Sequence, residues 1–407
     1  MKTKILTFTD RFKYELGILA LLLVQALLNL KRIMGMDGNF LVYYLSDFSM
    51  AKTSRMLVGT FVNLLTDHPT ERWINNFARI VLFATIVFVA VLLGRIVKSV
   101  DADKRVPLYV MILFFCTGTF TMHIFSAFFG MMDIYMFLFA VIAIVCLKNK
   151  YLRWFVPVFC LAGVLINIVF IFSFFPAVLL AVLYLAAFSE KKAGYIILFC
   201  VTALSVLALT YYCGFMFEGT VAVTVEEMRA IMERKFCAPV SDEQLEYFTA
   251  YIFGTDTDGQ NFLTGNIHDM SLNMLVKTLS DFMLSERLDT RGLMSLGVGA
   301  VPVMAAFWGI WIGCIRKTKE SGKKFVYLCF ILSALCIPFC LVLSTDPIRW
   351  YAAGVMTQFA LGFYMFYAKD KAFTETVEAI RKFFEDKKII FLLIFLAYVF
   401  IRHNELA

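Results

Sequence analysis

Long apolar runs alternate with short polar segments along most of the chain. A helix that crosses the hydrocarbon core of a bilayer needs about 20 mostly apolar residues, and many of the runs approach or reach that length. Lipid leaves α-helices and closed β-barrels as the only spanning structures, and the runs are far too long for barrel strands. The pattern predicts about eleven spans, at residues 14–33, 77–97, 107–128, 131–147, 154–171, 174–188, 193–213, 293–315, 325–343, 351–368 and 389–402.

The predicted fold class is therefore all-α: a polytopic transmembrane helical bundle in which residues 1–407 form a single transmembrane domain. Asp133 divides the third span from the fourth, and the Phe172–Pro176 segment divides the fifth from the sixth. Residues 154–188 give only about 17 residues for each pass, fewer than a full span needs. Two short spans and a re-entrant hairpin both fit this stretch, and both leave its flanks on the same side.

Composition supports a membrane location. Hydrophobic residues make up 61% of the chain and charged residues 17%, whereas soluble domains contain about 25% charged residues. The net charge of +7 does not indicate a nucleic-acid partner, because the basic residues lie at the ends of apolar runs. The chain also contains no Gly-rich phosphate loop. We expect a lipid bilayer as the surroundings, with neither a nucleic acid nor a cytoplasmic nucleotide sugar as partner.

The basic residues also predict the orientation. If the N-terminus is cytoplasmic, the inner segments hold 24 of the 38 Lys and Arg residues, while the outer segments hold most of the acids. This asymmetry follows the positive-inside rule. No Asn-x-Ser/Thr sequon occurs, which favours a bacterial source. The predicted location is the bacterial cytoplasmic (plasma) membrane.

Three amphipathic stretches lie outside the predicted spans. Two belong to large outer loops, 34–76 and 214–292, and we expect juxtamembrane helices there, at residues 52–66 and 270–287. The third, 372–388, is predicted to be a cytoplasmic interfacial helix. Simple packing of these helices on the bundle is the alternative.

Polar residues gather at the outer ends of the predicted helices, whereas the middles of the spans contain essentially no charged residue. This absence counts against an ion-coupled transporter, which usually places charges near the bilayer midplane. The candidate site residues are Asp37, Asp47, Arg55, His123, Asp133, Asp346, Arg349, Trp350 and Tyr351. The topology brings them all to one membrane face, which predicts a polar site there.

These residue types suit a lipid-linked phosphosugar. The phosphate needs a permanent cation, and the forked guanidinium of Arg55 or Arg349 fits its oxygens. The acceptor hydroxyl loses a proton as it attacks, which calls for a carboxylate such as Asp47. An aromatic ring at 350 or 351 can stack on a sugar. Structural alternatives remain open: Asp47 as a helix cap, Arg55 as a headgroup anchor, Arg349 as an interface residue and His123 as a packing residue.

With these residues in place, the chain resembles the GT-C class of integral-membrane glycosyltransferases. The similar segment runs from Ser46-Asp47-Phe48-Ser49 to Ser54-Arg55-Met56-Leu57-Val58-Gly59, an acid followed by a short spacer and an Arg. The chain also resembles Gram-positive membrane proteins associated with surface polysaccharides, through Asp346-Pro347-Ile348-Arg349-Trp350. The tandem acids of many GT-C enzymes are absent, because Phe48 follows Asp47.

The resemblance implies roles for the candidate residues. Asp47 would be the general base, with Asp37 as the alternative, and Arg55 and Arg349 would bind the donor phosphate. We place His123 with the phosphate-binding group and the remaining candidates, Asp133, Asp346, Trp350 and Tyr351, in the substrate-binding group. No metal ligands and no certain cofactor are predicted, although a divalent cation is left open.

The predicted function is sugar transfer from a polyprenyl-phosphate-linked donor to a cell-surface glycan or lipid-linked acceptor at the outer face. An enzyme that joins whole lipid-linked repeat units, similar to an O-antigen polymerase, is the first alternative. A flippase for lipid-linked saccharides is an alternative of another class. The sequence does not predict the sugar, the acceptor or the oligomeric state.

Overall fold

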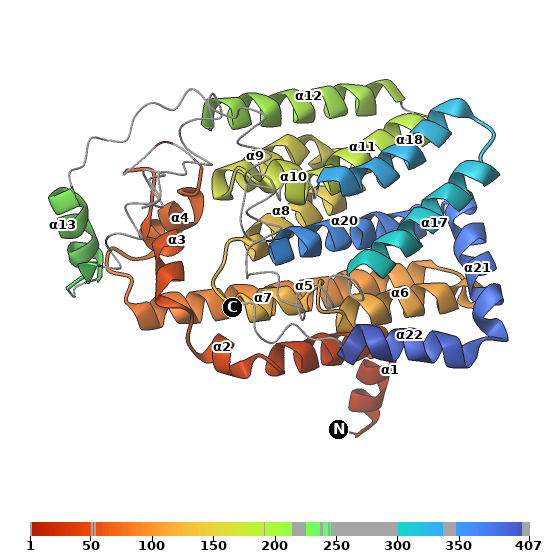
Figure 1. The fold of residues 1–407 in the computed structure, drawn as a ribbon, viewed down its shortest axis with the longest axis horizontal. Coiled ribbons are helices and arrows are strands. Elements are labelled where there is room, and N and C mark those ends of the chain that lie inside the picture. Colours follow the sequence, from red (N-terminus) through yellow and green to blue (C-terminus); the bar gives the residue numbers. More distant parts are fainter. Residues whose placement is uncertain are drawn as a thin grey trace, which may run out of the picture.

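The computed structural model describes residues 2–49, 52, 54–190, 192–213, 225–236, 239–242, 245, 300–336 and 347–400. Every regular element in these ranges is a helix (Figure 1). The all-α class predicted from the sequence is therefore confirmed for the part of the chain that is described.

The first half contains these elements: α1 (Lys2–Leu27), α2 (Leu30–Met34), η1 (Gly38–Leu41), α3 (Val42–Leu45), α4 (Leu57–Leu65), α5 (Glu71–Ser99), η2 (Ala102–Lys104), α6 (Arg105–Thr117), α7 (His123–Ala127), α8 (Asp133–Cys146), η3 (Leu152–Phe155), α9 (Val156–Ile166), α10 (Phe170–Ser173), α11 (Phe175–Phe188) and α12 (Lys192–Tyr211). The second half contains α13 (Val225–Phe236), α17 (Val301–Lys317), α18 (Ser321–Leu332), η7 (Ser333–Leu335), α20 (Pro347–Tyr367), α21 (Lys371–Glu385) and α22 (Lys388–Phe400).

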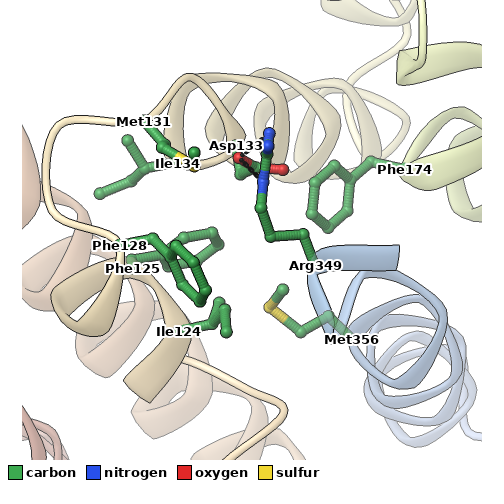
Figure 2. Close-up of a pocket in the computed structure, with 9 residues that line it drawn as sticks. All are labelled: Ile124, Phe125, Phe128, Met131, Asp133, Ile134, Phe174, Arg349 and Met356. Carbon is green, nitrogen blue, oxygen red and sulfur yellow. Dashed lines mark hydrogen bonds and ion pairs between the residues drawn. The ribbon is translucent and has the colours of Figure 1, made fainter. Parts of the chain in front are cut away.

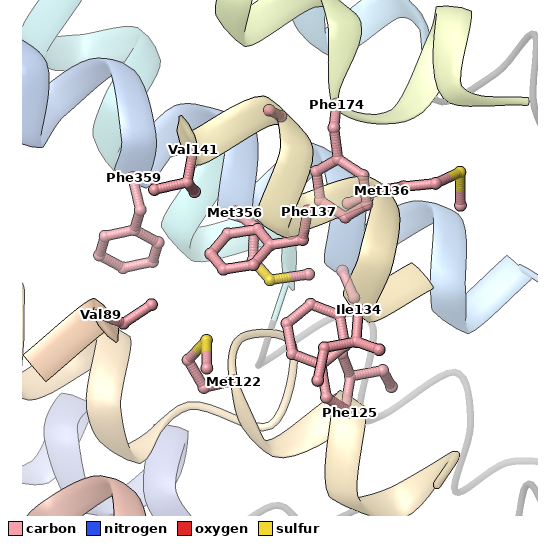
Figure 3. Packing of buried hydrophobic residues seen from close by; sticks show 14 of the residues in the cluster. Val89, Met122, Phe125, Ile134, Met136, Phe137, Val141, Phe174, Met356 and Phe359 are labelled. Carbon is pink, nitrogen blue, oxygen red and sulfur yellow. The ribbon is translucent and has the colours of Figure 1, made fainter. Parts of the chain in front are cut away.

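The long helices lie side by side in a bundle (Figure 1). Helices α3, α4 and α13 lie at one end, which we call the first-loop end, and α21 lies across the opposite end. The core between the helices is rich in aromatic side chains, such as Phe115 against Phe359 and Phe363 at ring separations of 5.4 Å. Figure 3 shows this packing around Phe137, where Phe174 and Met356 meet it from other helices. Such interdigitation fixes the helix ends that hold the polar residues.

Three predicted spans are interrupted among the described residues. The first, 14–33, consists of α1 and the short α2, which are separated at residues 28–29. The third, 107–128, ends as a helix at Thr117 and resumes at His123. The hydroxyl of Thr121 donates to the carbonyl oxygens of Phe115 and Gly118, at 2.6 and 2.8 Å, which stabilises the intervening turn. The fifth, 154–171, ends as a helix at Ile166 and resumes only as the four-residue α10 at Phe170. Each interruption contains polar residues or glycine within the apolar run: Asn29 in the first span, Gly118, Thr119 and Thr121 in the third, and Asn167 in the fifth.

Helices α5 and α12 alone among the described helices are both long and apolar enough to qualify as membrane spans by length and composition. The predicted number of eleven spans is therefore not confirmed. On α12, large apolar side chains face outward: Leu204 is 67% exposed and Ile197 54% exposed. An apolar surface of this kind is stable in lipid and costly in water.

The predicted juxtamembrane helices have different outcomes. In the 52–66 stretch the helix begins at Leu57, and Val58 and Val62 are buried while Phe61 is 51% exposed. Helix α21 occupies most of 372–388, and Asp370 caps its first turn by accepting a hydrogen bond from the Phe373 amide at 2.7 Å. The predicted helix at 270–287 lies outside the described residues.

Candidate active site

Asp47 lies in the loop between α3 and α4 and is only 2% exposed. Its Oδ1 atom accepts a hydrogen bond from the Ser49 amide at 2.8 Å and a second, short one from the Ser49 hydroxyl. The following amide, that of Phe48, donates to Thr60 Oγ1 of α4 at 2.9 Å. The loop is thus fixed both by its own side chains and by the helix after it.

Gly59 allows α4 to approach this loop closely. A Cβ atom at position 59 would lie 1.9 Å from the carbonyl oxygen of Ser46 and 2.7 Å from its carbonyl carbon. Both atoms belong to the backbone, so no side-chain rotation could relieve the clash. The glycine that ends the segment Arg55-Met56-Leu57-Val58-Gly59 therefore has a structural role: it lets α4 pack against Ser46, the residue before Asp47.

The partner of Asp47 is Lys235 of α13. Its Nζ atom lies 2.5 Å from Asp47 Oδ2 and donates to the Leu45 carbonyl oxygen at 2.7 Å. Both side chains are buried, with the Lys235 side chain 10% exposed. Lys235 was not among the predicted site residues. The one available signal is its position three residues after Met232, which is fully buried, because residues three apart share a helix face.

The pKa of Asp47 reflects opposing effects. Burial alone would raise this pKa, but the hydrogen bonds from Lys235 and Ser49 and the charge of Lys235 together lower it below the ordinary value of 3.8. Asp47 is therefore an ionised carboxylate at neutral pH. A carboxylate in this state can accept a proton from a hydroxyl that reaches it.

Arg55 has a left-handed backbone conformation, with φ of +74°. For a residue other than glycine this conformation costs about 1–2 kcal/mol. The Arg55 amide donates to the Leu165 carbonyl oxygen at 2.8 Å, and the preceding Ser54 hydroxyl donates to the Val164 carbonyl oxygen at 2.7 Å. These two bonds hold the strained turn against the end of α9 and stabilise its conformation.

Arg349 and Asp133 form a second ion pair, between the first turns of α20 and α8. The Nε and Nη2 atoms of Arg349 donate to the same oxygen of Asp133, at 2.9 and 2.6 Å. Figure 2 shows the guanidinium of Arg349 reaching Asp133 beside the ring of Phe174. Both side chains are about nine-tenths buried. Sequence analysis had assigned these two residues separate roles, and the structure pairs them.

A small cavity adjoins this pair. It is lined by Asp133, Arg349 and apolar side chains that include Phe125, Phe128 and Met356 (Figure 2). Its volume of about 10 Å³ is room for a single water molecule. A sugar does not fit it in this conformation, so substrate can reach the pair only after the surrounding side chains move apart.

The two ion pairs are connected through Tyr44 of α3. Its hydroxyl donates to the Gly130 carbonyl oxygen at 2.9 Å and lies 3.4 Å from the Tyr135 hydroxyl. Gly130 and Tyr135 flank Asp133, and Tyr44 precedes Asp47 by three residues. The loop that positions Asp47 therefore packs directly on the turn that positions Asp133.

The other predicted site residues have mixed outcomes. His123 is buried beside Asn29, whose Nδ2 atom lies 3.1 Å from His123 Nδ1. Trp350 is 2% exposed, so its indole face is closed to the sugar that we expected it to stack on. Tyr351 is half-buried and Asp37 is exposed. Asp346 lies outside the described residues.

Three buried hydrogen-bond donors next to these pairs have no partner in the part of the chain that the structure describes. They are the Ser46 hydroxyl, the Ser173 hydroxyl and the indole N–H of Trp350. Ser46 precedes Asp47, Trp350 follows Arg349, and Ser173 precedes Phe174 of the cavity wall. Each unmet donor costs about 1–3 kcal/mol, which water or a polar ligand would offset.

Among the described residues, no three His, Cys, Asp or Glu side chains gather closely enough to hold a metal ion. The ion pairs at this end combine one carboxylate with one cation each, which suits an anionic substrate better than a metal. Use of a divalent cation stays a prediction.

The sequence profile of glycosyltransferase family 87 matches residues 72–338, well over half of the chain, and the protein belongs to that family of integral-membrane, GT-C-like glycosyltransferases. The predicted enzyme class is thereby confirmed. Asp133 and Lys235 fall within the match, whereas Asp47, Arg55 and Arg349 lie outside it. No curated protein and no solved structure matches the chain significantly.

Proposed function

We propose that this glycosyltransferase takes a sugar from a polyprenyl-phosphate-linked donor and transfers it to a cell-surface glycan or lipid-linked acceptor. The reaction takes place at the outer face of the bacterial cytoplasmic membrane, beside the first-loop end. The observation that most supports this proposal is Asp47, a buried and ionised carboxylate whose partner is a cation from a distant segment.

Asp47 acts as the general base. The acceptor hydroxyl oxygen forms a bond to the anomeric carbon of the donor sugar, and the Asp47 carboxylate takes the hydroxyl proton. The bond between that carbon and the phosphate oxygen breaks, and its electron pair leaves on the polyprenyl phosphate. Negative charge therefore grows on the phosphate as the reaction proceeds, and a fixed cation lowers the barrier.

Arg349 and Arg55 are the cations that we assign to this phosphate. Asp133 orients the Arg349 guanidinium through its two hydrogen bonds, at 2.9 and 2.6 Å, and so acts as a positioning residue. The indole N–H of Trp350 and the Ser173 hydroxyl supply further donors for a phosphate or sugar oxygen. In this role Trp350 contributes a hydrogen bond in place of the stacking surface expected from the sequence.

The distribution of charge supports the orientation. Helix α21, at the opposite end of the bundle from Asp47, belongs to the basic segment 369–388 (Figure 1). Short segments rich in Lys and Arg tend to remain cytoplasmic, which favours an outer position for the first-loop end. A lipid-linked donor fits this arrangement, because its tail stays in the bilayer while its phosphosugar lies at the interface. Membership of a glycosyltransferase family favours transfer over flipping of a lipid carrier.

The test is a donor panel on sealed, right-side-out membrane vesicles that contain the protein. Radiolabelled polyprenyl-phosphate hexoses and nucleotide sugars are supplied separately from the outside, with vesicles lacking the protein as the control. We expect label transfer from a polyprenyl-phosphate donor alone. Transfer only from nucleotide sugars, or only in inside-out vesicles, would contradict the proposal. Ladders built from whole lipid-linked repeat units would favour polymerisation.

A further inference from the structure

Lys235 covers the carboxylate that the reaction needs. Asp47 Oδ1 accepts from the amide and hydroxyl of Ser49, and Oδ2 accepts from Lys235 at 2.5 Å. Both oxygens are thus engaged, and the carboxylate is 2% exposed. An acceptor hydroxyl can reach Oδ2 only if the Lys235 ammonium moves away from it.

The Lys235 ammonium should remain bound to Asp47 until another anion replaces the carboxylate. Separating a buried ion pair leaves an uncompensated charge, which is strongly unfavourable. Lys235 has three N–H donors, one of which bonds to the Leu45 carbonyl oxygen at 2.7 Å. That bond can keep the amine in place while another donor turns from Asp47 to a new anion.

We propose that Lys235 is a positioning residue that moves from Asp47 to the donor phosphate, so that the base is uncovered only when a polyprenyl-phosphate donor is bound. This inference rests on the proposed function. A phosphate is the fitting exchange partner, because a lysine ammonium binds phosphate as a point charge. Donor binding then precedes acceptor binding, because no acceptor hydroxyl can reach Oδ2 before the phosphate draws Lys235 away from it.

The helix that holds Lys235 suits a movable element. Six of the twelve residues of α13 are charged, and its Arg229 pairs with Asp242, whose side chain is 93% exposed. The C-terminal end of α13 contacts the first loop again, where His68 Nδ1 lies 3.1 Å from the Arg234 carbonyl oxygen. A small displacement of this helix end is enough to transfer one hydrogen bond.

The first experiment measures binding to the full-length protein in nanodiscs. The probes are farnesyl monophosphate, farnesol with the same tail, and inorganic phosphate. We expect the wild type to bind farnesyl monophosphate at least tenfold more tightly than farnesol, because charge-assisted hydrogen bonds contribute about 1.5–3 kcal/mol. Lys235→Met should lower that preference severalfold and leave the part that Arg349 and Arg55 supply. Lys235→Arg should keep the preference, and the control Lys371→Met, at a side chain 90% exposed, should leave it unchanged.

A second variant, Asp47→Asn, should change the affinity for farnesyl monophosphate in the opposite direction. Asp47→Asn removes the anion that competes for Lys235, so it should bind farnesyl monophosphate more tightly than the wild type. The double variant Asp47→Asn/Lys235→Met should bind it as weakly as Lys235→Met. The double variant also removes both buried charges together, which keeps the test available if the single Lys235 variant does not fold.

Several results would overturn the inference. Unchanged phosphate preference in folded Lys235→Met would do so, and so would weaker phosphate binding in Asp47→Asn. Inorganic phosphate that binds as tightly as farnesyl monophosphate would show a free-phosphate site instead. Sugar transfer that persists in Asp47→Asn would refute the proposed base. If Asp47→Asn loses transfer but Lys235→Met keeps the wild-type preference for farnesyl monophosphate, only the exchange of Lys235 would be refuted.

Discussion

Arg349 donates two hydrogen bonds to one carboxylate oxygen of Asp133, although 216 residues separate them in the sequence. The pair joins the first turn of α20 to the first turn of α8, beside a cavity too small for a sugar. Both partners are buried, so each charge depends on the other. The pair therefore has a structural role as well as the proposed role in binding phosphate.

The two roles can be separated by mutation. Asp133→Ala leaves a buried guanidinium without its carboxylate, and we expect a loss of about 3–5 kcal/mol in unfolding free energy. Asp133→Leu/Arg349→Met should recover most of that loss, because an apolar pair replaces the ion pair. Chemical denaturation in detergent measures both. The double variant should remain inactive in transfer; if it regains activity, Arg349 does not bind the phosphate.

Gly59→Ala should displace the loop that holds Asp47. The new Cβ would lie 1.9 Å from the Ser46 carbonyl oxygen, and relieving such a clash costs about 1–3 kcal/mol. We expect a lower melting temperature and a fall in transfer of at least tenfold. Gly38→Ala is the matched control in the same loop, because nothing lies within 4 Å of its Cβ position. Equal effects of the two substitutions would refute this account of Gly59.

Arg55→Gly and Arg55→Ala separate the backbone of Arg55 from its guanidinium. Both lose the charge, but only glycine adopts a φ of +74° without strain. The glycine variant should be about 1 kcal/mol more stable than the alanine variant. Both should lose transfer if the guanidinium binds the donor phosphate. Sugar transfer at the wild-type rate in the folded glycine variant would show that Arg55 does not bind the donor phosphate.

The Asp47–Lys235 pair predicts a defined pH dependence. Because the folded-state pKa of Asp47 lies below 3.8, the stability from this pair is complete above that ordinary value. It is lost as the pH falls through the folded-state pKa.

In Lys235→Met, burial raises the pKa of Asp47, so the acidic limb of kcat/KM should move to higher pH. Lys235→Arg should keep the wild-type profile. An identical profile in Lys235→Met would show that Asp47 is not the titrating base.

Local features of the fold were predictable from the sequence. The boundary between the predicted fifth and sixth spans overlaps the Phe172–Pro176 segment only in part: α9 ends earlier, at Ile166, the short α10 ends at Ser173, and α11 begins at Phe175. The amphipathic period of 372–388 gives α21. The turn at 118–122 was missed although it contains Gly118, Thr119 and Thr121, because glycine and threonine are also tolerated inside spanning helices. A hydrophobicity pattern does not reveal a turn in which the Thr121 hydroxyl donates a hydrogen bond to the Phe115 carbonyl oxygen.

The site was predictable only in part. Asp47, Asp133 and Arg349 stood out because a charge is costly next to long apolar runs. Which charges pair was not predictable, because pairing between residues 188 or 216 positions apart depends on how the helices pack. Lys235 lies in a helix with several other charged residues, so its position near Met232 was only a weak signal of burial. Trp350 was predicted to offer a stacking surface, but it is buried, and burial of this kind depends on tertiary packing.

The central claim is that Asp47 is the base for sugar transfer from a lipid-phosphate donor. The most direct test compares the single-turnover rates of Asp47→Asn and Asp37→Asn with that of the wild type, in nanodiscs loaded with a radiolabelled polyprenyl-phosphate hexose. We predict that Asp47→Asn slows transfer by about 10²–10⁴-fold, the usual contribution of a general base, while it still binds the donor. Asp37→Asn should transfer at the wild-type rate. A wild-type rate in Asp47→Asn, or a rate lost only in Asp37→Asn, would contradict the account.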